Sequence, residues 1–324
     1  MRARTKVWLI IAASLVLIGC IVFGGVMTML KWDFTKLSTV KYETHNYEID
    51  ESFNNISIVA DTADILIVPS ENQKASVVCH EQKNVKHSVT AKDGALVIEA
   101  VDTRKWYEYI GIGFGTPKIT VYIPRGEYGA LFVKSDTGNV EIPKEFKFET
   151  IDISESTGNV TNYASALEYI RIKTSTGNIC VENTSAKTLD LSVSTGMITV
   201  SNVACEGEVK IEVSTGKTNL TNIECKNVLS NGDTGDIFLK NVIVTEKFSI
   251  ERSTGDVKFD RCDAAEIFVK TDTGDVRGSL LSDKVFIVQS DTGNVDVPKT
   301  TTGGKCEITT STGDINIFAI VSQP

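Results

Sequence analysis

Hydrophobic and polar residues alternate along two short stretches that recur throughout residues 131–320. In each copy, one stretch precedes a glycine and the other follows it. Counted from that glycine, positions −7 and −5 are apolar in almost every copy, and position +2 is apolar in nine of ten, with Thr218 as the exception. Alternation with a period of two is typical of a strand with one buried face. The pattern therefore predicts two half-buried strands joined by a sharp bend.

The bend is marked by a tetrapeptide, Ser/Asp-Thr-Gly-X, that occurs ten times at intervals of 19 or 20 residues. Its glycines are Gly138, Gly158, Gly177, Gly196, Gly216, Gly235, Gly255, Gly274, Gly293 and Gly313. Glycine adopts left-handed backbone conformations at no steric cost, and Ser, Asp and Asn side chains form hydrogen bonds within turns. The tetrapeptide therefore predicts a tight corner in every copy.

A second corner is predicted at position +6, which is asparagine in four consecutive copies. These residues are Asn183, Asn202, Asn222 and Asn241. Asparagine tolerates the left-handed region, and its side-chain amides can stack into ladders between neighbouring strands. We therefore expect an amide ladder along this corner.

Together these features predict an all-β fold, a parallel β-helix or β-solenoid of about ten 19–20-residue coils, preceded by one N-terminal transmembrane helix. A single coil cannot bury its apolar face, so the coils must stack, with equivalent residues about 4.8 Å apart. Left-handed hexapeptide solenoids use coils of about 18 residues, so the longer coil favours a right-handed helix. An array of hairpins would give a similar alternation. The ten aligned threonines favour ladders between copies.

Residues 7–30 form a run of 24 residues without a charged side chain, long enough to span a bilayer as a helix. Arg2, Arg4 and Lys6 precede the run, which predicts a cytoplasmic N-terminus and an exported body. A cleaved signal peptide would have an apolar region of only about 7–15 residues. A lipoprotein anchored at Cys20 is the other alternative, because residues 17–20 resemble a lipobox, although the apolar run continues for ten residues beyond Cys20.

These features divide the chain into five parts. We expect a cytoplasmic N-terminus at residues 1–6, a transmembrane anchor at 7–30, a juxtamembrane spacer at 31–48, an N-terminal β cap with degenerate coils at 49–130, and regular solenoid repeats at 131–324. Within the cap, residues 56–68 resemble one coil with Ala63 in place of glycine. The cap would cover the solenoid end nearest the membrane, where open strand edges would otherwise be exposed.

The charge of the chain limits the kinds of partner that it can bind. Beyond the three basic residues at the N-terminus, 30 Lys and Arg stand against 42 Asp and Glu. An acidic body argues against nucleic acid as a partner, because phosphate binding needs clustered positive charge.

Aspartates accumulate at the glycine bends. Asp233, Asp272 and Asp291 occupy position −2, while Asp236, Asp256 and Asp275 occupy position +1. Stacked carboxylates repel one another unless they are screened, protonated or bridged by a cation, and Ca²⁺ prefers such oxygen ligands. Aspartate is also a good turn residue in its own right. These six residues are thus weak candidates for calcium, and no other cofactor is expected.

Cysteine and histidine give little indication of chemistry. Cys79, His80 and His87 lie near one another in sequence, but no second Cys/His pair stands at a zinc-finger spacing. Cys205 and Cys225 share one position in adjacent coils, so their Cα atoms could fall within disulfide range. Free thiols packed in the core are the alternative.

The STG/DTG repeats, the ITVYIP segment at residues 119–124 and the N-terminal anchor together resemble a bacterial family, the membrane-anchored putative-adhesin domain of unknown function. The resemblance covers residues 54–320. It implies a β-solenoid outside the membrane with a role in adhesion, and a link of some members to envelope-stress systems. The resemblance supplies no catalytic residues.

Two functions remain open. The first is a cell-surface adhesin-like interaction or structural protein that binds a protein or glycan ligand. The second is a cell-envelope accessory protein that acts as a sensor or scaffold for membrane partners. An enzyme is not expected, because β-helical lyases and hydrolases work from long irregular loops, whereas these coils differ by a single residue.

Overall fold

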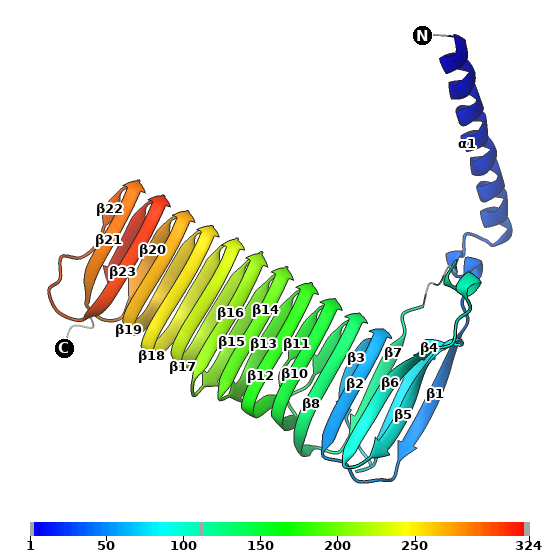
Figure 1. The fold of residues 1–324 in the computed structure, drawn as a ribbon, viewed down its shortest axis with the longest axis horizontal. Coiled ribbons are helices and arrows are strands. Elements are labelled where there is room, and N and C mark those ends of the chain that lie inside the picture. Colours follow the sequence, from blue (N-terminus) through cyan, green and yellow to red (C-terminus); the bar gives the residue numbers. More distant parts are fainter. Residues whose placement is uncertain (1–2, 111–112, 114, 321–324) are drawn as a thin grey trace.

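The computed structural model describes residues 3–110, 113 and 115–320. The helix α1 (Ala3–Met29) and two 3-10 helices, η1 (Phe34–Leu37) and η2 (Trp106–Ile110), accompany a body made of strands. The body is an elongated rod, and α1 leads away from one end of it (Figure 1). The predicted cytoplasmic segment, residues 1–6, lies partly outside the described residues.

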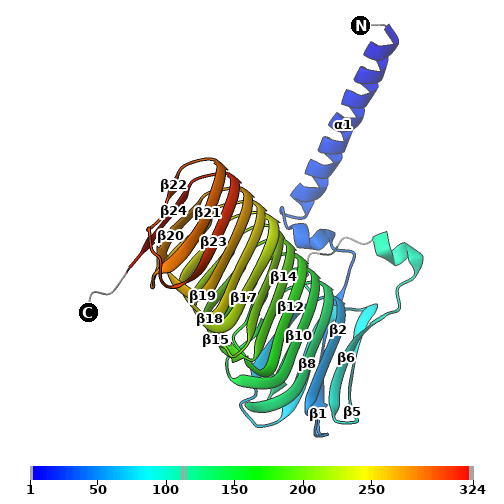
Figure 2. The same ribbon diagram turned by 60° about the vertical axis from the view of Figure 1, so that its left-hand side comes forward.

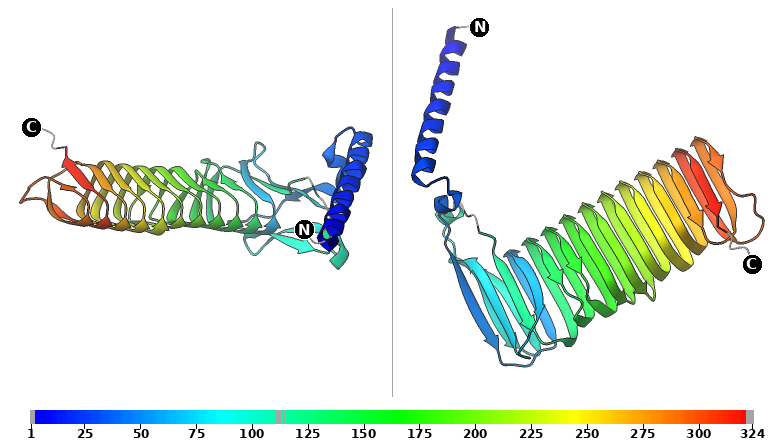
Figure 3. Two further views of the ribbon diagram at one scale, coloured as in Figure 1. Left: turned by 90° about the horizontal axis from the view of Figure 1, so that it is seen from above. Right: turned by 180° about the vertical axis from the view of Figure 1, so that it is seen from behind.

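Two faces of parallel strands form the rod, and the side view shows them enclosing a narrow interior (Figure 3). The first face, whose strands lead into the glycine bends, contains β2 (Asn55–Thr62), β6 (Ala95–Asp102), β8 (Gly126–Thr137), β10 (Phe146–Thr157), β12 (Ser165–Thr176), β14 (Thr188–Thr195), β16 (Glu208–Thr215), β21 (Lys284–Thr292) and β23 (Gly304–Thr312). The second face contains β3 (Asp64–Pro69), β7 (Lys118–Ile123), β9 (Val140–Ile142), β11 (Val160–Asn162), β13 (Ile179–Ala186), β15 (Ile198–Cys205), β20 (Val276–Leu280), β22 (Val295–Asp296) and β24 (Ile315–Ala319). Three long strands run from the second face around to the first: β17 (Thr218–Thr234), β18 (Ile237–Thr254) and β19 (Val257–Thr273).

The glycine-marked segments pair with one another as parallel ladders, which confirms the β-solenoid. In β10 and β12, Thr157 lies opposite Thr176, and the same threonine register continues from coil to coil. Inward-facing apolar columns form one continuous core along the rod. The hairpin alternative is wrong, because the ladders join different copies instead of the two halves of one copy. The handedness of the helix stays a prediction.

Both predicted corners are tight turns. Gly196 has φ +150°, and a Cβ there would overlap the carbonyl of Gly177 in the preceding coil. At the second corner, four asparagines have φ between 50° and 54°, and their side chains form the expected ladder. Its side-chain amides are joined by hydrogen bonds from Asn202 Nδ2 to Asn183 Oδ1 (2.9 Å), from Asn222 to Asn202 (2.8 Å) and from Asn241 to Asn222 (2.8 Å).

At the far end of the rod, the last two coils are stacked out of sequence order. β19 pairs with β23, and β21 pairs with the other edge of β23. The contacts between the bend glycines show the same order of coils, because Gly313 packs on Gly274, and Gly293 packs on Gly313. The coil of β21 and β22 is thus the outermost one. After residues 297–303, the coil of β23 and β24 lies between it and the coil of β19 and β20 (Figure 2).

The end near α1 is closed differently. The coil of β2 and β3 stacks on β8 and β9 with Ala63 at the position of the glycine, as its residues predict. β6 and β7 extend the two faces by one more parallel layer. Beyond them β1 (Tyr42–Ile49), β4 (Ala75–Gln82) and β5 (Val85–Lys92) add antiparallel strands. The change of direction ends the parallel ladder.

The helix α1 includes a segment, Thr5–Met29, that is long and apolar enough to cross a membrane, and most of its side chains are exposed, with Met27 near its end buried. By length and composition it is a membrane anchor or a signal sequence. Cys20 is exposed within α1, and the helix continues beyond it to Met29.

Cys205 and Cys225 lie in neighbouring coils, at the end of β15 and within β17. Both are buried free thiols, and the Sγ of Cys205 lies 3.3 Å from the carbonyl oxygen of Lys187. These cysteines therefore pack as small core residues.

Candidate functional site

The aspartates at position +1 act as acceptors for the turn of the next coil. The Oδ1 of Asp236 accepts a hydrogen bond from the backbone N–H of Asp256 (3.2 Å), and Asp256 Oδ1 accepts one from Asp275 N–H (2.9 Å). The guanidinium of Arg277 lies 2.8 Å from Asp256 and 3.3 Å from Asp275, and Lys217 lies 3.5 Å from Asp236. Backbone amides and cationic side chains thus offset the repulsion within this column.

The aspartates at position −2 are exposed. Asp291 accepts a 3.0 Å hydrogen bond from Gln289 Nε2. Burial lowers the pKa of the Arg252 guanidinium, and the negative charge of Asp233 partly opposes that shift. Asp272 is also exposed. Among the described residues, none of the six candidate aspartates belongs to a group of three side chains whose ligand atoms lie within 4.8 Å of one another. Calcium binding at the bends stays a prediction.

An open groove lies on the second face near the far end of the rod, with a volume of about 530 Å³. Two aromatic residues mark its ends: Phe238 is half-buried, and Phe318 is 54% exposed. Lys258 and Arg277 lie between them, and Lys258 Nζ sits 5.3 Å from the centre of the Phe238 ring. The groove therefore offers apolar rings beside two cationic groups and the carboxylates of Asp260, Asp275 and Asp314.

The register of the second face positions these side chains. Residues at the same position of four adjacent strands lie side by side: Phe238 in β18, Lys258 in β19, Arg277 in β20 and Asn316 in β24. The exchanged order of the last two coils places β24 beside β20. Gly278 lines the groove and lets its strand pack closely on the next one, since its φ is +136° and a Cβ there would overlap the carbonyl of Phe259.

The sequence analysis did not predict this groove. The alternation of apolar and polar residues identifies Phe238 and Phe318 as outward-facing, but their proximity depends on the exchanged coil order. The available signal was an aromatic residue at an outward position in each of the two strands.

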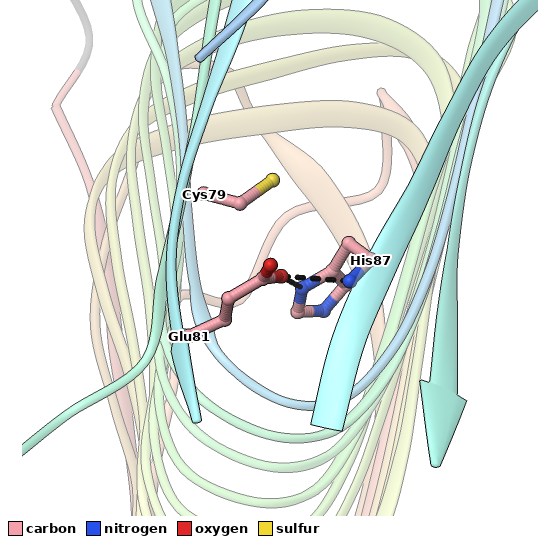
Figure 4. A group of neighbouring side chains, drawn as sticks. All are labelled: Cys79, Glu81 and His87. Atoms are coloured by element: carbon pink, nitrogen blue, oxygen red, sulfur yellow. Dashed lines mark hydrogen bonds and ion pairs between the residues drawn. The ribbon is translucent and has the colours of Figure 1, made fainter. Parts of the chain in front are cut away.

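A second group of functional side chains is buried in the cap. Cys79 and Glu81 are separated by one residue on β4 and both point inward, while His87 faces them from β5 (Figure 4). Cys79 and Glu81 are fully buried, and His87 is 5% exposed. The structure brings Cys79 and His87 together, whereas His80 points elsewhere and stacks on Tyr42 at 5.4 Å.

Glu81 is the centre of this group, and the sequence analysis missed it. Its Oε2 accepts hydrogen bonds from His87 Nδ1 (2.8 Å) and from the backbone N–H of His87 (2.7 Å). Its Oε1 accepts one from His45 Nδ1 (2.9 Å) on β1. The available signal was an acidic residue at an inward position, two residues after Cys79.

Burial controls the ionisation of the neighbouring thiol and phenol. Burial, and then the negative charge of Glu81, raises the pKa of Cys79 to about 12. Burial followed by Glu81 also raises the pKa of Tyr47, whose hydroxyl donates a 3.2 Å hydrogen bond to the carbonyl of His87. The group is thus a compact set of sulfur, oxygen and nitrogen atoms in a dry environment.

Comparison with known proteins agrees with the coil architecture. The sequence model of one family, described as Toastrack DUF4097, matches residues 53–216 and 206–321, which together are most of the chain. The chain belongs to the Toastrack family. The match begins within the cap of this Toastrack protein and continues to the last coil.

Solved structures that match the chain include two proteins named putative adhesin from Parabacteroides. The one from Parabacteroides merdae is 14% identical, with a TM-score of 0.46, and the match covers 87% of this chain and 98% of that one. The one from Parabacteroides distasonis is 12% identical, with a TM-score of 0.45, and the match covers 84% and 98%. No curated protein matches the chain.

Proposed function

We propose that this Toastrack protein is an adhesin-like interaction protein of the cell surface, tethered by α1 and without catalytic activity. The observation that carries the proposal is a rod of nearly equal coils with an open groove of about 530 Å³ on one face. A long, regular scaffold that stacks short repeats is suited to presenting an extended binding surface.

The groove on the second face is the proposed contact surface. Phe238 and Phe318 provide apolar rings, while Arg277 and Lys258 can donate hydrogen bonds to carbonyl, carboxylate or hydroxyl oxygens. Such a combination suits a protein or a glycan. The formal net charge of the chain, −9, disfavours nucleic acid.

The apolar helix α1 is proposed to remain uncleaved and to hold the rod on the outer side of the membrane. The basic residues before the apolar run support a cytoplasmic N-terminus. Intact-mass measurement of the protein isolated from membranes tests this arrangement. A chain that begins at Cys20 and carries lipid would instead establish the lipoprotein alternative.

Binding of the full-length protein, reconstituted into fluorescent vesicles, to cells tests the proposed function. A Phe238→Ala/Phe318→Ala double variant should reduce the number of bound vesicles at least tenfold, because two groove-forming rings are lost. Phe268→Ala is the matched control, because Phe268 is a half-buried ring beside Lys247 on the other face. Equal binding by wild type, double variant and control would contradict the groove, and absent binding would contradict adhesion.

The chemistry of the ligand follows from treating the target cells before binding. Loss of binding after protease treatment identifies a protein, and loss after periodate oxidation identifies a glycan. Photo-crosslinking from the position of Phe318 in intact cells addresses the envelope-accessory role. Recovery of co-anchored membrane proteins alone would favour that role over adhesion.

A further inference from the structure

The ligand atoms of Cys79, Glu81 and His87 all lie within 4.8 Å of one another, and all three side chains are buried. Two of these residues come from β4 on the second face and the third from β5, so the group joins both faces of the terminal layer (Figure 4). A thiol, a carboxylate and an imidazole are the three ligand types that Zn²⁺ binds in proteins. Among the described residues, this is the one group of its kind.

We propose that Cys79, Glu81 and His87 form a Zn²⁺ site in the cap. The ligand atoms are Cys79 Sγ, one carboxylate oxygen of Glu81, and Nδ1 of His87. When zinc binds, the thiol proton of Cys79 leaves to solvent and the ring proton of His87 moves from Nδ1 to Nε2, so the imidazole stays neutral and the freed electron pairs of Sγ and Nδ1 bind the metal. No oxidation or reduction takes place.

Charge balance favours zinc at this buried position. A thiolate and a carboxylate together carry two negative charges, which neutralise the two positive charges of the ion, while imidazole is neutral. A neutral site avoids the cost of leaving a net charge in a dry interior. A singly charged cation would leave this ligand set negatively charged.

Neighbouring groups already hold the carboxylate in place. His45 Nδ1 donates to Oε1 of Glu81 at 2.9 Å, and the backbone N–H of His87 donates to Oε2 at 2.7 Å. Such supporting hydrogen bonds orient metal ligands and typically change affinity by about 10–100-fold. His45 is therefore a positioning residue, not a ligand.

A water molecule would supply the fourth ligand of the metal, and a nearby cavity reaches one of the three protein ligands. A small cavity of about 40 Å³ borders His87 and is lined also by Gln82 and Arg104. A cavity of this size has room for a water molecule, and its polar lining can hold one. The same cavity gives solvent a route towards the group from the surface of the cap.

Metal analysis of the full-length protein in detergent tests the site. A chelator first removes bound metal, and the protein is then dialysed against buffer with trace zinc. The wild type should take up one zinc per chain. Substituted Co²⁺ should give a thiolate-to-metal charge-transfer absorption in the near ultraviolet, because cobalt accepts the same ligand set. Cys79→Ala should abolish both signals, and His45→Gln should weaken zinc binding by about 10–100-fold.

Cys262→Ala is the matched control, because Cys262 is another buried free thiol, located in β19 far from the cap. It should retain one zinc and the cobalt band. If Cys79→Ala does not fold, His87→Gln must lose the metal while a folded circular dichroism spectrum is retained. A folded wild type without stoichiometric zinc, or a cobalt band that survives both Cys79→Ala and His87→Gln, would overturn the site.

Discussion

The guanidinium of Arg252 donates a 3.2 Å hydrogen bond to the hydroxyl of Thr218, two coils away in the core of the rod. The same nitrogen, Nη2, also donates to the hydroxyl of Ser230 (3.2 Å), and Nη1 donates to the carbonyl of Val213 (3.2 Å). Burial lowers the pKa of Arg252 to about 10, with a smaller opposing effect from Asp233, so the guanidinium is charged at neutral pH. A buried cation therefore has a polar pocket built for it.

Thr218→Val should lower the free energy of unfolding by about 1–3 kcal/mol, although valine restores the apolar pattern of its column. The loss arises because the buried guanidinium of Arg252 loses an acceptor. Denaturant unfolding of the full-length protein in detergent measures it. Ile198→Thr, at the same position one coil earlier, is the reciprocal control, because it buries a hydroxyl without this cation nearby.

Replacing the whole polar set should behave differently from replacing one member. Gly232 leaves the space through which Arg252 passes, since a Cβ there would overlap Nη1. The combined variant Thr218→Val, Ser230→Ile, Gly232→Val and Arg252→Thr should be nearly as stable as wild type. A combined loss equal to the sum of the single losses would contradict the buried-cation explanation.

Gly196→Ala should destabilise the rod by at least about 2 kcal/mol, because the new Cβ meets the carbonyl of Gly177 and φ is +150°. Gly126→Ala is the control, since nothing lies within 4 Å of a Cβ there. Thermal unfolding compares the two variants. Equal midpoints would show that the bends tolerate a side chain and that the coils are less closely stacked.

Arg261→Asn should stabilise the protein by about 0.5–1 kcal/mol. Arg261 occupies the next position of the asparagine corner with φ +53°, and an asparagine there would extend the amide ladder to Asn241. The ion pair lost, from Arg261 Nε to Asp260 at 3.6 Å, is exposed and contributes little. Asn222→Ala should do the opposite, because it removes two ladder bonds. An unchanged midpoint in both variants would mean that the ladder does not stabilise the fold.

Glu155→Gln should make stability depend less on pH. Burial raises the pKa of Glu155 from 4.5 to about 7, with smaller contributions from Asp136 and Asp64. Because the folded state holds its proton more tightly than the unfolded chain, wild type loses stability as pH rises from about 4.5 to about 7.

The variant should therefore match wild type below pH 4.5 and exceed its stability by roughly 1–3 kcal/mol above pH 7. Unfolding midpoints across this range provide the measurement. Glu141→Gln, which removes an exposed carboxylate from the same end of the rod, reports any general effect of the lost charge. A constant difference between Glu155→Gln and wild type at all pH values would be inconsistent with a buried titrating group.

Much of this architecture could be predicted from the sequence, because a period-two pattern determines which side chains face inward. The glycine bends, the threonine column and the ladder from Asn183 to Asn241 follow from single columns of residues. Thr218 was visible as an exception in such a column. The partner of Thr218 could not be predicted, because Arg252 lies two coils away and reaches Thr218 across the interior.

The order of the coils could not be predicted. Every coil presents the same backbone edge and nearly the same columns of side chains. The sequence pattern therefore allows either the segment at Gly313 or the segment at Gly293 to stack on Gly274. The groove between Phe238 and Phe318 depends on that choice. The buried group around Glu81 was missed for a related reason, because the pattern shows that a residue points inward but not which residue faces it.

Disulfide formation between introduced cysteines tests the coil stack and its exchanged end directly. Lys270 lies opposite Thr309 in the neighbouring strand, whereas Gln289 lies one layer further out. Lys270→Cys with Thr309→Cys should form a disulfide, and Lys270→Cys with Gln289→Cys should not, because Cα atoms two layers apart exceed about 7 Å. Glu251→Cys with Lys270→Cys is the positive control for adjacent coils. A bond between positions 270 and 289, with none between 270 and 309, would contradict the exchanged order and the groove built on it.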